Sequence, residues 1–169
     1  MHIMKMNGYS IDGLYCKSLK CGNVLSKKII DAPINRYLVT NDGIVYSIHE
    51  QQKDGRPAGI YFYRFFDERI VPLVQGEDDT FGNFAVCGNM LVYFDKNEGQ
   101  MRQIDRINGG TPLTLFDIST GRIIEINVLE NCVILNYSIE QETPTYWKAS
   151  QHRIYVFDYE GNALHVFDG

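Results

Sequence analysis

Three segments of the sequence can be laid over one another, and this internal repeat constrains the fold more than any other feature. The copies begin near Arg36, Asn83 and Glu125, so their offsets are 47 and 42 residues. Each copy holds short apolar runs in the same order, with short and long connections alternating between them. A repeat of this length predicts one supersecondary unit per copy, and the units must stack because none buries its apolar face alone.

The spacing of apolar residues predicts β-strands throughout. Almost no stretch has helical spacing, whereas many short runs rich in Val, Ile, Tyr and Phe are bounded by Gly, Asn and Asp. With the strands of each copy named A to D, the expected ranges are 37–40, 44–48, 60–63 and 70–74, then 84–86, 91–94, 113–116 and 123–124, and finally 126–129, 133–137, 154–157 and 163–167.

A Phe-Asp pair is the strongest match between the copies, and it is expected to close strand C before the turn into strand D. The pairs are Phe66-Asp67, Phe116-Asp117 and Phe157-Asp158. An Asp side chain at such a place accepts hydrogen bonds from the backbone amides of the turn. We therefore expect these aspartates to stabilise turns rather than to bind a ligand.

The offsets match the roughly 40 to 50 residues of one four-stranded propeller blade. Ahead of the copies, residues 13–25 have the pattern of one further C–D hairpin. The sequence therefore predicts an all-β, β-propeller-like fold with three four-stranded antiparallel blades plus an N-terminal hairpin. The expected divisions are 1–35 for the partial blade and 36–76, 83–124 and 125–169 for the three blades.

The segment 153–167, RIYVFDYEGNALHVF, resembles the blade hairpin of six-bladed β-propellers of the TolB-like and NHL-like class. That resemblance implies a fold common among bacterial cell-envelope proteins, and it says little about activity because propellers of this kind have unrelated functions. Three and a half blades do not close a six-bladed ring. A homodimer, a compact four-bladed monomer, a fragment of a longer chain and a partner that covers the ends all remain open.

Connection lengths predict where binding residues lie. The A–B and C–D turns are short, whereas the expected B–C connections are long and cover 50–58, 96–110 and 140–151. Long loops on a rigid scaffold are where binding residues concentrate. The candidate binding residues are those of the three loops and of the acidic D–A connection on the same side, namely Arg56, Arg102, Arg106, Tyr146, Trp147, Lys148, Asp78 and Asp79.

Charge and composition exclude several classes of function. The net charge of −5 disfavours nucleic acid and anionic lipid as partners. No apolar run is long enough to span a membrane as a helix. Motifs of common hydrolases and nucleotide enzymes are absent, and neither the four cysteines nor the four histidines have metal-site spacing. We therefore expect no cofactor, no metal site and four free thiols.

These features favour a non-enzymatic binding module whose long-loop face contacts a protein or a glycan-like ligand. One alternative is a lactonase-like propeller hydrolase with an acidic metal site in its channel. Another is a structural half-propeller that assembles as a homodimer. The sequence as written predicts a cytoplasmic protein, or a cell-envelope protein if a leader has been removed. The identity of the partner is not encoded in any motif.

Overall fold

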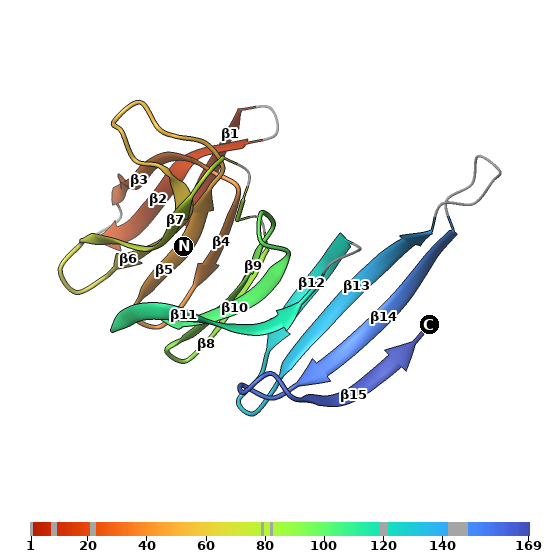
Figure 1. Cartoon of the computed structure of the whole chain (residues 1–169). Helices are drawn as coiled ribbons and strands as arrows, with labels where there is room; N and C mark the ends of the chain where they lie inside the picture. The colour runs from red at the N-terminus through yellow and green to blue at the C-terminus, as the bar shows by residue number, and fades with distance from the viewer. Residues whose placement is uncertain are drawn as a thin grey trace. The chain divides into compact units, whose positions relative to one another are not determined.

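The computed structural model of this chain describes residues 2–7, 10–20, 23–78, 80–81, 83–118, 122–141 and 149–169. Within these ranges the secondary-structure elements are all β-strands, and the strands form four separate antiparallel sheets (Figure 1). The predicted all-β fold, with three four-stranded sheets after an N-terminal hairpin, is confirmed. The chain divides into two compact units, Met1–Gly82 and Asn83–Gly169, which are described in turn.

The first unit, Met1–Gly82, holds two sheets in which each strand pairs with the one before it in the chain. The three-stranded sheet consists of β1 (His2–Asn7), β2 (Ser10–Lys20) and β3 (Asn23–Ile34). The four-stranded sheet consists of β4 (Arg36–Val39), β5 (Gly43–Ile48), β6 (Ala58–Arg64) and β7 (Ile70–Gly76). The expected N-terminal hairpin is present as β2 and β3, and β1 adds a third strand to it.

A single apolar cluster joins the two sheets of the first unit. Ile44, Tyr46 and Ile48 alternate along β5, so their side chains lie on one face of the strand. They pack with Ile30 and Ile34 of β3 in a cluster that excludes water from both sheets. Burial of such side chains stabilises a fold by about 1.5–3 kcal/mol each, so this cluster is what holds the unit together.

The second unit, Asn83–Gly169, holds two four-stranded sheets. The first consists of β8 (Phe84–Cys87), β9 (Met90–Asp95), β10 (Gln100–Asp105) and β11 (Gly109–Asp117). The second consists of β12 (Arg122–Val128), β13 (Val133–Gln141), β14 (Ala149–Phe157) and β15 (Ala163–Asp168). Both sheets again have their strands in chain order.

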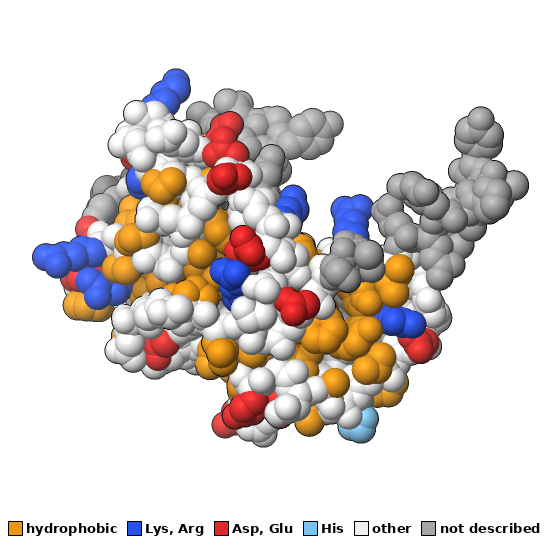
Figure 2. Space-filling view, in the orientation of Figure 1, with side chains coloured by type: hydrophobic (Ala, Val, Ile, Leu, Met, Phe, Trp, Pro, Cys, Tyr) orange, Lys and Arg blue, Asp and Glu red, His pale blue; other side chains and the backbone are white. Residues whose placement is uncertain are grey.

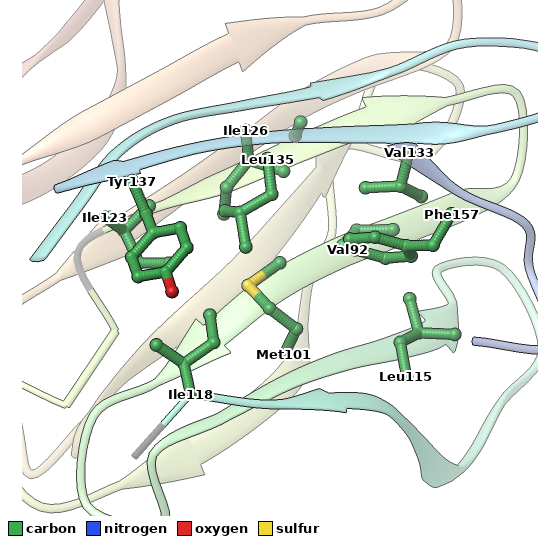
Figure 3. Packing of buried hydrophobic residues seen from close by; sticks show 11 residues of the cluster. Val92, Met101, Leu115, Ile118, Ile123, Ile126, Val133, Leu135, Tyr137 and Phe157 are labelled. Atoms are coloured by element: carbon green, nitrogen blue, oxygen red, sulfur yellow. The ribbon is translucent and has the colours of Figure 1, made fainter. Parts of the chain in front are cut away.

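The core of the second unit lies between its two sheets. Figure 3 shows Met101 and Leu115 of the first sheet on one side of the core, with Val133, Leu135 and Phe157 of the second sheet opposite them. All five side chains are buried. Phe116 stacks on the Phe157 ring with a centroid distance of 5.9 Å.

One expected loop is a strand. Residues 96–110 were predicted to form a long B–C connection, but β10 occupies Gln100–Asp105 and pairs with β9 in register from Gln100 opposite Asp95 to Asp105 opposite Met90. The connection before it is only the tight turn 96–99. The segment 113–116, which was expected to be strand C, therefore belongs to the fourth strand β11.

A second correction concerns Ile123 and Ile124, which were expected to form the last strand of the second sheet. They belong to β12, which pairs with β13 and begins the third four-stranded sheet. A register shift lies between Ile123 and Glu125, so Ile123 is buried while Ile124 is exposed. The residues between the two sheets are therefore 118–121, of which only Ile118 is described.

The aspartate turns are confirmed at two of the three expected positions. Asp67 accepts a hydrogen bond from Arg69 N at 3.3 Å, and Asp158 accepts one from Asn162 N at 2.8 Å. The equivalent residue in the second sheet is Asp105, which accepts hydrogen bonds from Ile107 N and Asn108 N at 2.8 Å each. Asp117 ends β11, the last strand of its sheet, so the prediction that it closes a C–D turn was wrong.

Two further expectations concern thiols and membranes. Cys87 and Cys132 are free thiols, as predicted, whereas the side chains of Cys16 and Cys21 lie outside the part of the chain whose side chains are described. Among the described residues no helix has the length and apolarity that crossing a bilayer requires.

Candidate functional site

The connection 49–57 between β5 and β6 is the long B–C loop that the structure describes in full. It folds on itself, because Gln52 N donates a hydrogen bond to Arg56 O at 2.7 Å and Gly55 N donates one to Gln52 O at 2.9 Å. Gly55 has φ 87°, a backbone conformation that side-chain-bearing residues rarely adopt. The loop is therefore a folded turn on the rim of the first unit.

Arg56 fastens this loop to β3. Its Nε donates to Asp54 Oδ2 at 2.7 Å, and an Nη atom donates to the carbonyl oxygen of Asp31 at 2.8 Å. The backbone N–H of Arg56 also donates to Asp54 Oδ1, and this hydrogen bond is the main reason that the pKa of Asp54 lies below its usual value. The guanidinium thus has its donors engaged within the protein.

Two buried tyrosines support the loop from below. The rings of Tyr46 and Tyr61 stack with centroids 5.7 Å apart. Tyr61 OH donates to the carbonyl oxygen of Pro57 at 2.6 Å and accepts a hydrogen bond from Gln75 Nε2 at 3.3 Å. Burial raises the pKa of Tyr46 to about 12, although the nearby Arg56 guanidinium opposes that shift. The loop therefore packs against two buried, uncharged tyrosine side chains.

Two hollows lie against this loop. One, of about 550 Å³, is lined by Asp31, Ala32, Pro33, Glu50, Gln51, Gln52, Lys53, Asp54 and Arg56. The other, of about 540 Å³, is lined by Gln51, Pro57, Ala58, Gly76, Glu77 and Asp78. Gln51 borders both, and its backbone N–H donates to Asp78 Oδ1 at 3.0 Å. We call this double concavity the loop hollow.

The loop hollow is predominantly acidic. Its lining includes five carboxylates and two basic side chains, Lys53 and Arg56, and Arg56 is already paired with Asp54. Figure 2 shows Asp and Glu side chains gathered beside one another where β7 ends. Glu50, Glu77 and Asp78 are exposed, so their charges face solvent. This surface favours a ligand group that is positively charged or that donates hydrogen bonds.

Two of the predicted binding residues border the loop hollow. Arg56 lines one of its two hollows and Asp78 lines the other, and Gln51 borders both. The prediction that the acidic D–A connection lies beside a long B–C loop is supported by the hydrogen bond between Gln51 and Asp78. Asp31 and Pro33 of β3 complete the hollow and were not predicted, because loop length carries no information about which neighbouring strand approaches a loop.

Arg102 and Arg106 do not lie in a long loop, since Arg102 belongs to β10 and Arg106 to the short turn that follows it. Arg102 lies within β10, where its guanidinium pairs with Asp95 Oδ2 at 3.4 Å and donates to Gln100 Oε1 at 2.8 Å. Arg106 is only 5% exposed and donates from Nε to the carbonyl oxygen of Gly88 at 2.7 Å. Both arginines therefore tie strands and turns together, and neither guanidinium is presented on a loop surface.

The remaining predicted binding residues, Tyr146, Trp147, Lys148 and Asp79, lie outside the residues that the structure describes. Their binding role stays a prediction. The strands on either side are longer than expected, since β13 continues to Gln141 and β14 begins at Ala149. The third B–C connection is therefore 142–148 rather than 140–151.

Candidate metal ligands do not gather in the described ranges. No group of three or more His, Cys, Asp or Glu side chains is placed there to hold a metal ion. The carboxylates of the loop hollow are spread over two loops and a strand. The alternative of an acidic metal site for hydrolysis therefore has no ligand set among these residues.

Comparison with known proteins identifies a fold class. No protein-family model matches the sequence, and no curated protein matches it. The structure is similar to a chain of the crystal structure of a nidogen/laminin complex, with a TM-score of 0.59 and 9% sequence identity, and the match covers 95% of this chain and 59% of that chain. That neighbour is a β-propeller.

The fold is therefore β-propeller-like, as the repeat predicted. This chain spans less than two thirds of the length of the propeller chain that it matches. The comparison does not assign the chain to the TolB-like or NHL-like class. The comparison supports the fold class alone, and the function is inferred below from the loop hollow.

Proposed function

We propose that this chain is a non-enzymatic binding module that holds a protein partner at the loop hollow. The observation that carries the proposal is the anchored concavity itself, in which a folded loop is fixed to β3 by Arg56 and supported by Tyr61. A preorganised surface loses little conformational entropy on binding, so more of its contact energy appears as affinity.

Charge indicates which part of a partner the loop hollow suits. Glu50, Glu77 and Asp78 offer exposed carboxylates, while the principal cation of the site, Arg56, is engaged by Asp54 and Asp31. A segment bearing Lys or Arg would complement this surface, and the complementarity would raise the association rate more than the affinity. A glycan would meet polar groups here but no described aromatic platform.

The fold neighbour is consistent with a protein partner. The matched propeller comes from a structure of nidogen with laminin, which is a complex between proteins. At 9% identity the match supports only the fold of this chain. The residues that line the loop hollow are the reason for proposing that the partner binds at the loop hollow. The binding role of Trp147, Tyr146 and Lys148 on the third B–C connection is a separate prediction that does not depend on the loop hollow.

Site-specific photocrosslinking tests the proposal. A photoreactive amino acid at Lys53, which lines the loop hollow, should give a discrete protein adduct in extracts of the cells that produce the chain. The same group at Arg69, an exposed residue on the β6–β7 turn, is the matched control in the same unit. Adducts of equal yield at both positions, or none at Lys53, would overturn the proposal.

A charge-reversal pair separates the site from general electrostatic attraction. The double variant Glu50→Lys, Glu77→Lys should reduce capture of the crosslinked partner at least about tenfold, because like charges then oppose each other across the contact. Glu130→Lys, at the exposed β12–β13 turn, changes the net charge in the same direction and should leave capture within about twofold. Equal losses in both variants would show that the attraction is not local.

A further inference from the structure

The two hollows that make up the loop hollow differ in charge. The hollow of about 540 Å³, which we call the Asp78 hollow, is lined by Glu77 and Asp78 and by no basic side chain. The hollow of about 550 Å³, which we call the Arg56 hollow, is lined by Lys53 and Arg56 as well as by carboxylates. A cationic group of a partner therefore meets only opposing charge in the Asp78 hollow, whereas basic side chains repel it in the Arg56 hollow.

The Asp78 carboxylate is held in place from across the hollow. Its Oδ1 accepts a hydrogen bond from the backbone N–H of Gln51 at 3.0 Å, and Gln51 lines both hollows. Its Oδ2 accepts no hydrogen bond from the residues that the structure describes. Asp78 is exposed, so this second oxygen is accessible to a ligand. The carboxylate therefore presents one oxygen at a fixed position, while its other oxygen is already bonded.

One wall of the Asp78 hollow is small and uncharged. Ala58 lies opposite Gly76 at the end of the β6–β7 ladder, so this pair carries a single methyl group. Pro57 precedes Ala58, and its carbonyl oxygen accepts the hydrogen bond from the Tyr61 hydroxyl at 2.6 Å. Gly76 lies against the Phe81 ring, because a Cβ on Gly76 would be 2.9 Å from two of the ring atoms. These contacts fix a wall that offers apolar surface and no charge.

An apolar wall beside paired carboxylates matches the two parts of a long basic side chain. Such a side chain packs its methylene stem along apolar surface and keeps its charged end at a polar rim. In the Asp78 hollow the stem can lie along Pro57, Ala58 and Gly76, and the charged end then reaches Glu77 and Asp78. A short cation would reach the carboxylates without using the wall.

The hydrogen bond to Gln51 favours lysine over arginine at this place. A guanidinium binds a carboxylate most strongly as a bidentate pair, which needs both carboxylate oxygens. Asp78 offers only Oδ2, because Oδ1 is bonded to the backbone of Gln51. A lysine ammonium has no fork geometry to satisfy, so its N–H donors can bond single oxygens of separate groups. The oxygen that Asp78 presents therefore suits an ammonium.

We propose that the Asp78 hollow binds a lysine side chain of the protein partner. The inference rests on the proposed function, and it adds which of the two hollows takes the cation and which residue type supplies it. The stem of that lysine lies along the wall of Pro57, Ala58 and Gly76, and its ammonium bonds Asp78 Oδ2 beside Glu77. The Arg56 hollow, which has basic side chains of its own, is not the cation site.

NMR titration of the whole 19.4 kDa chain with N-acetyl-lysine N-methylamide tests the proposal. The backbone amide signals of Ala58, Gly76 and Asp78 should shift saturably, and more than those of Lys53 and Asp54 in the Arg56 hollow. Each methylene removed, in the series lysine, ornithine, diaminobutyrate and diaminopropionate, should raise the dissociation constant about two- to fourfold at constant charge. The arginine analogue should bind at least about threefold more weakly than the lysine amide.

Three outcomes of this titration would overturn the proposal. Equal affinity along the series would show that the stem does not use the wall. Larger shifts in the Arg56 hollow would place the cation in the wrong hollow, and an arginine analogue that binds as tightly as the lysine amide would remove the preference for lysine.

A charge-removing variant tests the role of Asp78 itself. Asp78→Asn keeps an oxygen that accepts from Gln51 N but loses the charge, so it should weaken binding of the lysine amide at least about fivefold. Glu130→Gln, at the exposed β12–β13 turn, removes the same charge elsewhere and should leave binding within about twofold. The NMR spectrum of each variant reports whether it is folded, and the series of amides on the wild-type chain does not depend on any variant.

The photocrosslink at Lys53 separates this inference from the proposed function. A Lys53 adduct that is lost in Asp78→Asn and displaced by the lysine amide would support both. An adduct that neither change affects would overturn the lysine site and leave the binding module in place. Saturable binding of the lysine amide in the Asp78 hollow without any Lys53 adduct would support the lysine site and overturn the proposed function.

Discussion

Gly161 approaches the backbone of Leu115 so closely that a side chain does not fit between them. A Cβ atom built on Gly161 would lie 2.4 Å from the carbonyl oxygen of Leu115. Gly161 belongs to the turn between β14 and β15, and Leu115 belongs to β11 of the other sheet in the same unit. The C–D turn of one sheet is therefore seated on the backbone of its neighbour, which fixes the spacing of the two sheets at that end.

Substituting Gly161 should destabilise the second unit. Gly161→Ala places a methyl group against Leu115 O and also forces alanine into φ 88°, a conformation that is costly for residues with a side chain. We expect a loss of about 2–4 kcal/mol in the free energy of unfolding. Urea denaturation followed by far-ultraviolet circular dichroism measures it.

Gly109 provides the control for that substitution. It is the first residue of β11, directly after the corresponding turn, with φ 69°, and a Cβ there meets nothing within 4 Å. Gly109→Ala should therefore cost only the backbone strain, about 1–2 kcal/mol. If both variants lose equal stability, the close approach to Leu115 contributes nothing and the interpretation is wrong.

Acid should destabilise the chain through its aspartate turns. Hydrogen bonds from Asn162 hold the pKa of Asp158 below the usual value of an aspartate, and hydrogen bonds from Asn108 and Ile107 do the same for Asp105. A carboxylate whose pKa is lowered by folding contributes stability above its unfolded pKa and loses it as the pH falls through the folded value. The melting temperature should therefore decline once the pH drops below about 4.

The double variant Asp105→Asn, Asp158→Asn checks this assignment. Asparagine keeps one oxygen for the backbone hydrogen bonds of each turn and has no proton to gain, but it loses the oxygen that accepts from the side-chain amide of Asn108 or Asn162. The acid-induced decline in melting temperature should become shallower in this variant, and its stability at neutral pH should be lower than that of the wild type. An unaltered decline would assign the acid sensitivity to other groups.

The two tyrosines below the loop hollow should respond differently to loss of the hydroxyl. Tyr61→Phe removes the hydrogen bond to Pro57 O and the one from Gln75, so we expect a loss of about 1–2 kcal/mol. The Tyr46 hydroxyl is buried and has no hydrogen-bond partner within 3.5 Å among the described residues. Tyr46→Phe should change stability by less than about 0.5 kcal/mol, and thermal denaturation distinguishes the two.

Much of the fold could be predicted from the sequence because most strands are short runs rich in Val, Ile, Tyr and Phe, bounded by Gly, Asn and Asp. The first four-stranded sheet matches the prediction strand for strand, since residues such as Ile44, Tyr46 and Ile48 mark one face directly. Strand β10 was missed because its sequence, QMRQID, is mostly polar. It is stabilised by tertiary contacts, with Met101 in the core and Arg102 paired with Asp95, which no local pattern reveals.

The error at β10 also displaced two candidate site residues. Once 96–110 was interpreted as a loop, Arg102 and Arg106 became loop arginines, whereas they stabilise a strand and a turn. A better signal was present in the turn residues. Asp105 and Gly109 resemble the Asp and Gly of the 158–162 turn, and that match would have placed a C–D turn there. Arg56 and Asp78 were found because their loop was identified correctly.

Removing the Arg56 side chain should loosen the loop without unfolding the protein. Arg56→Ala deletes the ion pair with Asp54 and the hydrogen bond to Asp31 O. Partly exposed ion pairs contribute little to global stability, so we expect a change below about 1 kcal/mol. Hydrogen exchange of the amides in 51–56 should nevertheless accelerate, because local opening no longer breaks those contacts. Unchanged exchange would contradict the anchoring role.

The side-chain amide of Gln103 links the two sheets of the second unit. Gln103 is 8% exposed, and its Nε2 donates to Tyr159 O at 2.8 Å. Gln103→Met keeps a similar volume but leaves that carbonyl oxygen without its donor, so the free energy of unfolding should fall by about 1–2 kcal/mol. Tyr159→Phe retains that carbonyl and removes only the hydroxyl that donates to Leu129 O, so it is the control, and its effect should add to that of Gln103→Met. If Gln103→Met is as stable as the wild type, packing alone holds this turn, and the polar residues of β10 have no role in joining the sheets.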